Sequence, residues 1–237
     1  MMVTRIATAG RTAAVATLAG AAALVLAVGT AHATPDPPRG EGTLYGNPAA
    51  AAAFWRYQGY DDDCVEMAVS DVVGELTGRQ PSEQVIVKLA QSTPSIVHPG
   101  PIYTKPKKRK PDSGTSFDDE PALLAHYGIH AVSTDRARAA KAGLPTGLTA
   151  LEQDLAKDRK VMVGVNSELI WREPVEDRGP DGQPEANHAV VVTGVDTAAG
   201  VVHLNDSGIE QGRDELVPID LFAQSWDTSD NQMTVTG

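Results

Sequence analysis

Residues 188–206 read HAVVVTGVDTAAGVVHLND and contain two valine-rich segments, 188–195 and 201–205, joined by a short stretch that ends in glycine. Valine favours β-strands, and two such runs separated by a turn indicate a hairpin. His188 opens the first strand, and Asp206 directly follows the second. A hairpin between the two strands therefore brings the Asp206 carboxylate beside the His188 imidazole.

Upstream of this hairpin, residues 64–77 form the best-specified helix in the sequence. Its apolar residues recur at the spacing of one helix face: Val65, Ala68, Val69, Val72, Val73 and Leu76. Asp63 is positioned to cap the helix, Glu66 to complete a capping box, and Gly78 to end it. Cys64 then falls in the first helical turn and off the apolar face.

The remaining segments place helices mostly before strands. Apolar spacing and turn residues predict helices at 82–91, 118–127 and 148–157, strands at 129–133, 160–166 and 233–236, and a helical region at 217–226. This order favours an α+β fold with an antiparallel sheet over alternating βαβ units. We expect the helix that carries Cys64 to pack on the sheet that carries His188 and Asp206.

The N-terminus has the layout of a secretory signal peptide. Arg5 and Arg11 precede an apolar run over 13–28, and the run leads to the small-residue cleavage site Ala31-His32-Ala33. The run is shorter than the roughly 20 residues that a membrane-spanning helix needs. We therefore expect a signal peptide at 1–33, cleavage near Ala33, secretion to the extracellular space or cell envelope, and no stable membrane anchor.

The rest of the chain reads as one domain preceded by a flexible N-terminal arm. Residues 34–53 are rich in Pro, Gly and Ala, so we expect a flexible N-terminal arm before a domain at 54–237. An insertion at 93–117 holds five prolines and the basic run at 105–110. We interpret the insertion as a solvated surface loop, with a polybasic patch for anionic partners as the alternative.

Charge and cysteine content narrow the set of possible partners and functions. The chain has 20 Lys and Arg against 31 Asp and Glu, and residues 1–33 contain two arginines and no acid, so the expected mature charge is −13. Such acidity disfavours nucleic acid and anionic membranes as partners. The single cysteine, Cys64, cannot form an intrachain disulfide, which leaves a reactive thiol, an intermolecular bridge or a small buried apolar residue.

The position of Cys64 favours chemistry. The free N–H groups and the positive dipole end of a helix start stabilise a thiolate, although Asp61, Asp62 and Asp63 oppose it by charge repulsion. His188 is the best candidate base, because a strand start holds a side chain rigidly yet leaves it within reach of a cleft. Asp206 would fix the imidazole tautomer, as the third member of a triad does.

The other histidines indicate no further site. Histidines 98, 126, 130 and 203 read as surface or sheet residues. His126 and His130 are spaced four apart, but Gly128 interrupts a common helical face and no third ligand is evident. Since no glycine-rich phosphate loop follows a strand, we expect neither a metal nor a cofactor.

Several of these motifs together resemble the C39-like cysteine peptidases of the papain-like superfamily. That family shows a Gln, an Asp-Cys pair opening a helix, a His-Ala-Val strand ending near Gly, an Asn-Asp pair after the next strand, and a trailing Phe…Trp turn. The matching residues are Gln58, Asp63-Cys64, His188-Ala189-Val190-Val191-Val192-Thr193-Gly194, Asn205-Asp206, Phe222 and Trp226. The chain departs from the pattern at Val65, where the family usually has Gly, and at Ser207, where it often has Pro.

The resemblance implies a papain-like fold and a Cys-His-Asp triad. Cys64 would be the nucleophile, His188 the general base and acid, and Asp206 the orienting carboxylate. Gln58 would donate its side-chain amide to the oxyanion. Val65, next to the nucleophile, would be expected to crowd that oxyanion site.

The function implied is that of a secreted, monomeric cysteine peptidase that cleaves peptide or amide bonds through an acyl-thioester on Cys64. Its partner would be a peptide or protein substrate. One alternative is a non-catalytic module of the same fold that binds a peptide or cell-wall component. Another is a papain-like amidase or acyltransferase.

Overall fold

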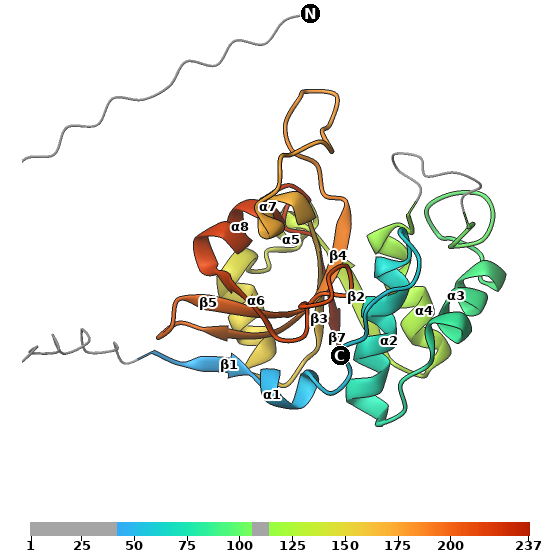
Figure 1. The fold of residues 1–237 in the computed structure, drawn as a ribbon, viewed down its shortest axis with the longest axis horizontal. Helices are drawn as coiled ribbons and strands as arrows, with labels where there is room; N and C mark the ends of the chain where they lie inside the picture. The colour runs from blue at the N-terminus through green and yellow to red at the C-terminus, as the bar shows by residue number, and fades with distance from the viewer. Residues whose placement is uncertain (1–41, 106–113) are drawn as a thin grey trace, which may run out of the picture. The chain divides into compact units, whose positions relative to one another are not determined.

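The computed structural model describes residues 42–105 and 114–237 (Figure 1). The expected signal peptide lies outside the described residues, as does the basic run except for Lys105. Nowhere in the described ranges is a helix both long and apolar enough to cross a membrane.

The described chain contains one seven-stranded sheet in which all neighbouring strands are antiparallel. Its strands are β1 (Leu44–Gly46), β2 (Ala131–Thr134), β3 (Val161–Val165), β4 (His188–Asp196), β5 (Val201–Asn205), β6 (Glu215–Pro218) and β7 (Met233–Thr236). The order is β2-β7-β3-β4-β5-β6, and β1 pairs with the far end of β4. The predicted α+β fold with an antiparallel sheet is confirmed.

Helices cover both faces of the sheet. They are α1 (Pro48–Ala51), α2 (Cys64–Thr77), α3 (Glu83–Ser92), α4 (Glu120–His126), α5 (Arg136–Ala142), α6 (Gly147–Leu155), α7 (Ser167–Trp171) and α8 (Ile219–Asp227). In Figure 1, α2, α3 and α4 lie together on one side of the sheet, and α6, α7 and α8 lie on the other. The helix that begins with Cys64 therefore packs on the sheet, as the sequence predicts.

Each face of the sheet has its own hydrophobic core, because successive side chains of a strand point to opposite faces. On β4, Ala189 and Val191 belong to the core that contains residues of α2, whereas Val190 and Val192 belong to the core that contains residues of α8. Both faces of the central strands are covered, which explains why they read as continuous apolar runs rather than as an alternating pattern.

Helix α2 begins and ends where predicted, with Gly78 at φ 70° accepting the left-handed conformation at its end. The prediction of one apolar face, with Cys64 off it, is wrong. Every residue from position 64 to 74 is buried, because the helix is enclosed by the sheet on one side and α3 and α4 on the other. The predicted capping box is also wrong. The Asp63 side chain makes no capping bond, and Glu66 accepts a hydrogen bond from Thr115 Oγ1 at 2.6 Å.

The N-terminal arm is more ordered than its composition indicates. Residues 44–46 form β1 and pair with residues 194–196 of β4, and Asn47 caps α1 through its side chain. The expectation of a flexible arm is therefore wrong for this part of 34–53. A three-residue strand has no local signal, because its partner lies about 150 residues away in the chain.

Two further differences lie in the C-terminal half. The predicted helical region at 217–226 is a strand end followed by a helix, since β6 runs to Pro218 and α8 starts at Ile219. Helices α5 and α7 lie in segments that the sequence left as loops. Both are short, and α7 proves important for the site.

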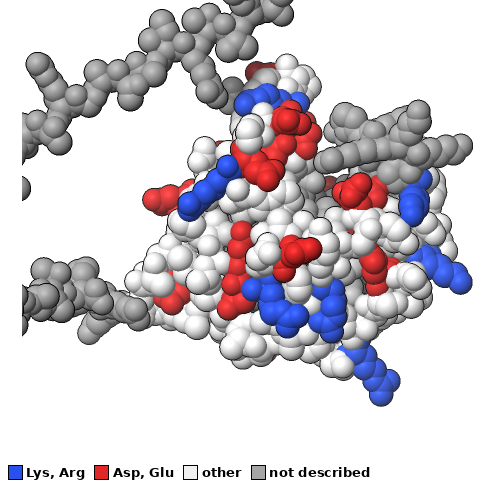
Figure 2. Space-filling model, in the orientation of Figure 1, with Lys and Arg blue, Asp and Glu red and all other residues white. Residues whose placement is uncertain are grey.

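The surface beside the start of β4 is acidic. Figure 2 shows red carboxylate side chains, with some blue basic ones among them, on the projecting segment that joins α7 to β4 in Figure 1. This segment carries five acidic residues: Glu173, Glu176, Asp177, Asp181 and Glu185. Part of the strong acidity of the chain is thus concentrated next to His188.

Candidate active site

His188 and Asp206 meet as the hairpin predicts. The β4–β5 register pairs Val191 with Asn205, so the first residue of β4 and the residue after β5 lie at the same end of the hairpin. The His188 Nε2 atom lies 2.7 Å from Asp206 Oδ1. Both side chains are buried, which protects this bond from competition with water.

Three hydrogen bonds hold the Asp206 carboxylate. Oδ1 accepts bonds from His188 and from the Gly208 backbone N–H at 2.7 Å, and Oδ2 accepts one from Trp171 Nε1 at 2.9 Å. Burial acts to raise the pKa of Asp206, but the charge of His188 and these bonds together keep it below its usual value. Asp206 is therefore ionised in the folded protein at neutral pH.

His188 is close to both Asp206 and Cys64. Burial acts to lower the pKa of His188, but the Asp206 carboxylate and the nearby Cys64 raise it well above its usual value. Because Nε2 faces Asp206, Nδ1 is the ring nitrogen left for the thiol. This arrangement favours an imidazolium beside the cysteine.

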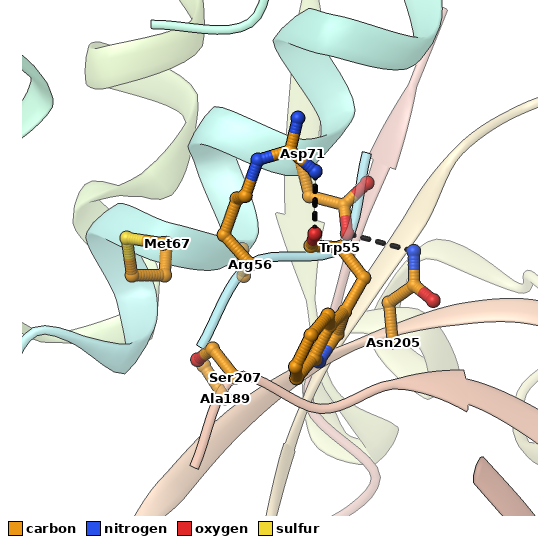
Figure 3. A pocket seen from close by; sticks show the side chains of 8 residues that line it. Trp55, Arg56, Met67, Asp71, Ala189, Asn205 and Ser207 are labelled. Atoms are coloured by element: carbon orange, nitrogen blue, oxygen red, sulfur yellow. Dashed lines mark hydrogen bonds between the residues drawn. The ribbon is translucent and has the colours of Figure 1, made fainter. Parts of the chain in front are cut away.

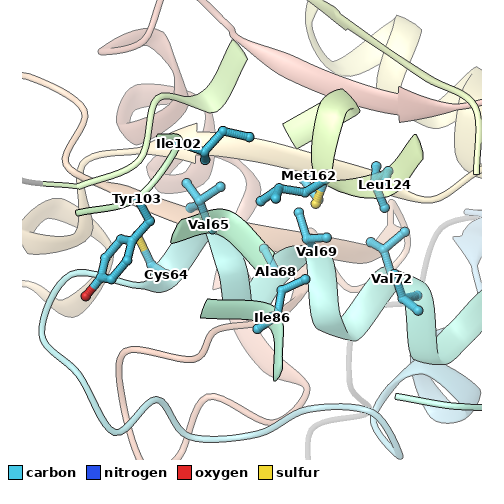
Figure 4. Close-up of a cluster of buried hydrophobic side chains, with 14 of the residues drawn as sticks. Cys64, Val65, Ala68, Val69, Val72, Ile86, Ile102, Tyr103, Leu124 and Met162 are labelled. Atoms are coloured by element: carbon cyan, nitrogen blue, oxygen red, sulfur yellow. The ribbon is translucent and has the colours of Figure 1, made fainter. Parts of the chain in front are cut away.

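Cys64 is the first residue of α2 and is 8% exposed. Figure 4 shows its side chain beside Tyr103, while Val65 points toward Ile102 and Met162 in the core. Val65 is 1% exposed and packs in the core on this face of the sheet, and crowding of the oxyanion site by Val65 stays a prediction. Adjacent side chains on a helix point about 100° apart, so a bulky residue after the cysteine is accommodated in the core.

Gln58 is fixed between the hairpin and its own loop. Its backbone N–H donates to Ser207 O at 2.9 Å, and its Oε1 accepts from Ser207 Oγ at 2.9 Å. Its Nε2 donates to Tyr60 O at 2.8 Å. Because Nε2 carries two hydrogens, one N–H is left for a ligand. Ser207, one of the two positions that depart from the family pattern, holds Gln58 against the segment that carries Asp206.

The charge repulsion expected from the three aspartates is smaller than their number implies. Asp63 is fully buried, and burial, together with Glu83, raises its pKa to about 9. It is therefore protonated and neutral at pH 7. Asp62 accepts a hydrogen bond from Tyr103 OH at 2.8 Å, and Asp61 is exposed to solvent.

Trp171 and Gly208 belong to the site, although sequence reasoning placed Trp171 in a loop and gave Gly208 no role. The Trp171 ring centroid lies 5.4 Å from that of His188, on the side of the bond to Asp206. A Cβ atom at Gly208 would lie 2.8 Å from Trp171 and 3.0 Å from His188 Cε1. Continuing the Val191↔Asn205 register sets Gly208 opposite His188, but the register shifts between Val192 and Gly194, so the sequence alone does not identify this glycine.

A small cavity lies behind the site, between α2 and the hairpin (Figure 3). It has room for about one water molecule, at about 10 Å³. The buried Asp71 accepts a hydrogen bond from Asn205 Nδ2 at 2.8 Å through Oδ2, while its Oδ1 has no partner within the described ranges. Asn205 also donates to Ala51 O, so it ties the hairpin to α1 and α2.

Among residues 42–105 and 114–237, no three His, Cys, Asp or Glu side chains are grouped so as to hold a metal ion. The chemistry available from the described side chains is that of an imidazole bonded to a carboxylate at one end of the sheet, with a thiol near the imidazole.

This fold occurs in a known class of proteins. A solved structure from Bacillus anthracis, described as a C39-like peptidase, resembles the chain with a TM-score of 0.56. The match covers 82% of this chain and 98% of that one at 16% sequence identity. The chain thus has the α+β fold of the C39-like, papain-like peptidases.

Close relatives occur in mycobacteria. The chain is 53% identical over 239 residues to Rv1268c of Mycobacterium tuberculosis and to Mb1299c of Mycobacterium bovis, and each match covers 100% of both chains. The chain belongs to the family of these mycobacterial proteins, both of which are described as uncharacterised. No protein-family model matches the chain.

Proposed function

We propose that the protein is a cysteine peptidase that hydrolyses peptide or amide bonds through a covalent thioester on Cys64. The observation that carries the proposal is the buried His188–Asp206 hydrogen bond, with Cys64 interacting with the same imidazole. An activated cysteine nucleophile needs a base within reach and a third group to orient that base.

In the proposed acylation step, the Cys64 thiolate attacks the substrate carbonyl carbon. The C–S bond forms, and the carbonyl π electrons move to the oxygen. The free N–H of Gln58, together with a backbone N–H near Cys64, stabilises this oxyanion. The His188 imidazolium then gives its proton to the leaving amine as the C–N bond breaks.

Deacylation uses the same groups in reverse. Neutral His188 takes a proton from water, and the hydroxide attacks the thioester carbonyl. The C–S bond then breaks, releasing a carboxylic acid and restoring the thiolate–imidazolium pair. Asp206 stays ionised throughout and keeps Nδ1 of His188 directed at the sulfur.

We also propose that the protein is exported and acts on a peptide or protein outside the cell or in its envelope, as a monomer. The proposal is supported by the arginine-led apolar segment and small-residue cleavage site at 1–33. N-terminal sequencing of the protein from culture supernatant is expected to begin near Thr34. An intact N-terminus on protein that stays with the cells would contradict the proposal of export.

The first prediction is that iodoacetamide at pH 7 labels Cys64 faster than it labels a free-cysteine peptide. The His188→Ala variant is expected to label no faster than the peptide, because the imidazolium that stabilises the thiolate is gone. The same variant, and Cys64→Ala, should lose hydrolysis of labelled casein. Rates are measured by mass spectrometry and fluorescence.

The chain offers a matched control for His188. His203 lies in the same hairpin and its Nδ1 contacts Asp214 Oδ1 at 2.7 Å, but it interacts with no cysteine. His203→Ala should keep the wild-type labelling rate. Labelling of the wild type at the peptide rate would reject the triad, and hydrolysis that survives Cys64→Ala would point to another nucleophile.

A binding module of the same fold is the second candidate, and the low exposure of Cys64 favours it. It predicts slow labelling and no hydrolysis, together with peptide binding that survives Cys64→Ala. Calorimetric titration with casein-derived peptides separates the two candidates.

A further inference from the structure

We propose that Glu83 is a positioning residue for the oxyanion site, acting through the loop that carries Gln58. This inference rests on the proposed function. Glu83 is the first residue of α3, outside the Cys-His-Asp group, and its Oε1 accepts the Gly59 backbone N–H at 2.5 Å. Glu83 therefore fixes the backbone of Gly59, the residue that follows Gln58, the proposed oxyanion donor.

The Gln58 carboxamide is held at two points, and Glu83 controls one of them. Ser207 holds Oε1 from the hairpin side, while Tyr60 O holds Nε2 from the loop side. Gly59 is the link between Gln58 and Tyr60, so a shift of Gly59 moves the Tyr60 carbonyl. The remaining N–H of Gln58 then changes direction.

The contact at Gly59 is close. A Cβ atom at position 59 would lie 2.9 Å from Glu83 Oε2 and 3.1 Å from Oε1. The absence of a side chain at Gly59 thus lets the carboxylate reach the backbone. The side chains of Asp62 and Tyr60 have contacts of their own, with Tyr103 OH and with Lys105 Nζ 3.9 Å above the Tyr60 ring, whereas the Gly59 backbone N–H is held by Glu83.

Asp63 supplies the second half of the arrangement. Its side chain is fully buried beside Glu83, and neither of its oxygens has a donor among the described residues. Burial and the neighbouring Glu83 raise the pKa of Asp63 to about 9, so at pH 7 Asp63 is protonated and has an O–H to donate to Glu83. Glu83 then joins the residue before Cys64 to the residue after Gln58.

The protonated Asp63 carboxyl group has three acidic neighbours. They are Glu83 of α3, Glu66 of α2 and Asp62 of the loop. Tyr103 OH donates a hydrogen bond to Asp62. Ionisation of Asp63 would place it among like charges, so Glu83 and Gly59 are expected to separate at alkaline pH. The wild-type protein should lose kcat as the pH rises past about 9.

The second prediction tests Glu83 with two reactions of the same thiol. Alkylation by iodoacetamide needs the thiolate but forms no oxyanion. Addition to the aldehyde of acetyl-Leu-Leu-argininal forms a C–S bond, moves the C=O π electrons to oxygen and protonates that oxygen from His188. Only the second reaction uses the oxyanion site.

Glu83→Ala is expected to lower kcat for casein hydrolysis and the affinity for the aldehyde by about 10- to 100-fold, as for a misplaced catalytic group. The alkylation rate should stay within about twofold of the wild type, because the His188–Asp206 bond is untouched. Glu83→Gln keeps an acceptor for Gly59 and should recover part of the loss. Gln84→Ala, an exposed position on the same helix, is the matched control.

The outcomes separate the two proposals. If wild-type Cys64 labels slowly and no hydrolysis is found, the proposed function fails and this inference fails with it. If the wild type is active but Glu83→Ala keeps its kcat and aldehyde affinity, only the inference is overturned. If the alkylation rate of Glu83→Ala falls as much as its kcat, the inference is also overturned, because Glu83 would then act on the nucleophile or on folding. Thermal denaturation of Glu83→Gln checks the fold.

Discussion

At the scale of single residues, the site depends on close contacts as much as on reactive groups. Trp171 donates to one Asp206 oxygen while His188 and the Gly208 N–H occupy the other. The tryptophan ring covers the His188–Asp206 bond, and excluding water strengthens such a bond. Gly208 has no side chain, which leaves room for both rings.

The third prediction concerns that space. In Gly208→Ala the new Cβ must displace Trp171 or His188, since it would lie within 3.0 Å of both rings. We expect overpacking to cost about 1–3 kcal/mol of stability, and ring misplacement to lower kcat by about 10-fold or more. Urea denaturation and casein hydrolysis measure the two effects.

The control for this substitution is Gly114→Ala, because the added Cβ would meet no atom closer than 3.9 Å. It should leave both stability and activity close to wild type. If Gly208→Ala behaves as this control does, the tryptophan does not pack against His188 as tightly as the structure indicates.

At the scale of elements, the sheet is held between two separate cores. Leu123 of α4 belongs to the core on the α2 side, and Leu151 of α6 lies in the core on the α8 side. Helix α2 is buried on all sides because it lies between the sheet and α3 and α4. Cys64, the proposed nucleophile, is thus carried by an enclosed helix.

The fourth prediction is that both cores are needed for stability. Leu123→Ala and Leu151→Ala remove fully buried side chains, so each should cost about 2–5 kcal/mol. Leu216→Ala, at a position 57% exposed on β6, should change stability by less than about 0.5 kcal/mol. Chemical denaturation measures all three variants. A near-neutral result at Leu151 would mean that the α8-side core is dispensable.

At the scale of the whole molecule, several buried acids have pKa values well above the usual value of a carboxyl group. Burial raises the pKa of Glu66 to about 7 and that of Glu120 to about 8, in addition to Asp63. In the unfolded chain these groups ionise near pH 4. Between these values the folded state binds more protons than the unfolded state, so stability decreases as the pH rises.

The fifth prediction follows from this decrease of stability with rising pH. The free energy of unfolding should be higher at pH 5 than at pH 9. The raised pKa of His188 also lowers stability as the pH rises above 6.5. Glu120→Gln should flatten the decline between about pH 4.5 and 8. Denaturation at five pH values measures the slope, and stability that rises from pH 5 to 9 would contradict the buried, protonated state. Asp220→Asn, at an exposed acid, is the control.

Much of the fold was predictable because its signals are local. The valine runs of β4 and β5 and the turn between them are adjacent in sequence, so the hairpin and the His188–Asp206 pair follow from periodicity alone. Helix α2 was predicted to the residue, because its apolar spacing and Gly78 lie within one short segment. Strand β1 and helices α1, α5 and α7 were missed, since they are short and are stabilised by distant segments, and the short strand β6 was also not predicted.

The sequence by itself determined helix α2 and the β4–β5 hairpin, the residue types that bear chemistry and the ends of the elements that carry them. Only the tertiary structure decided which neighbours these residues meet: Trp171 over His188, Ser207 on Gln58 and Glu83 on Gly59. It also decided the charge of Asp63, because a carboxyl group is neutral or ionised according to its burial and neighbours. Such properties depend on many segments at once, so no single stretch of sequence encodes them.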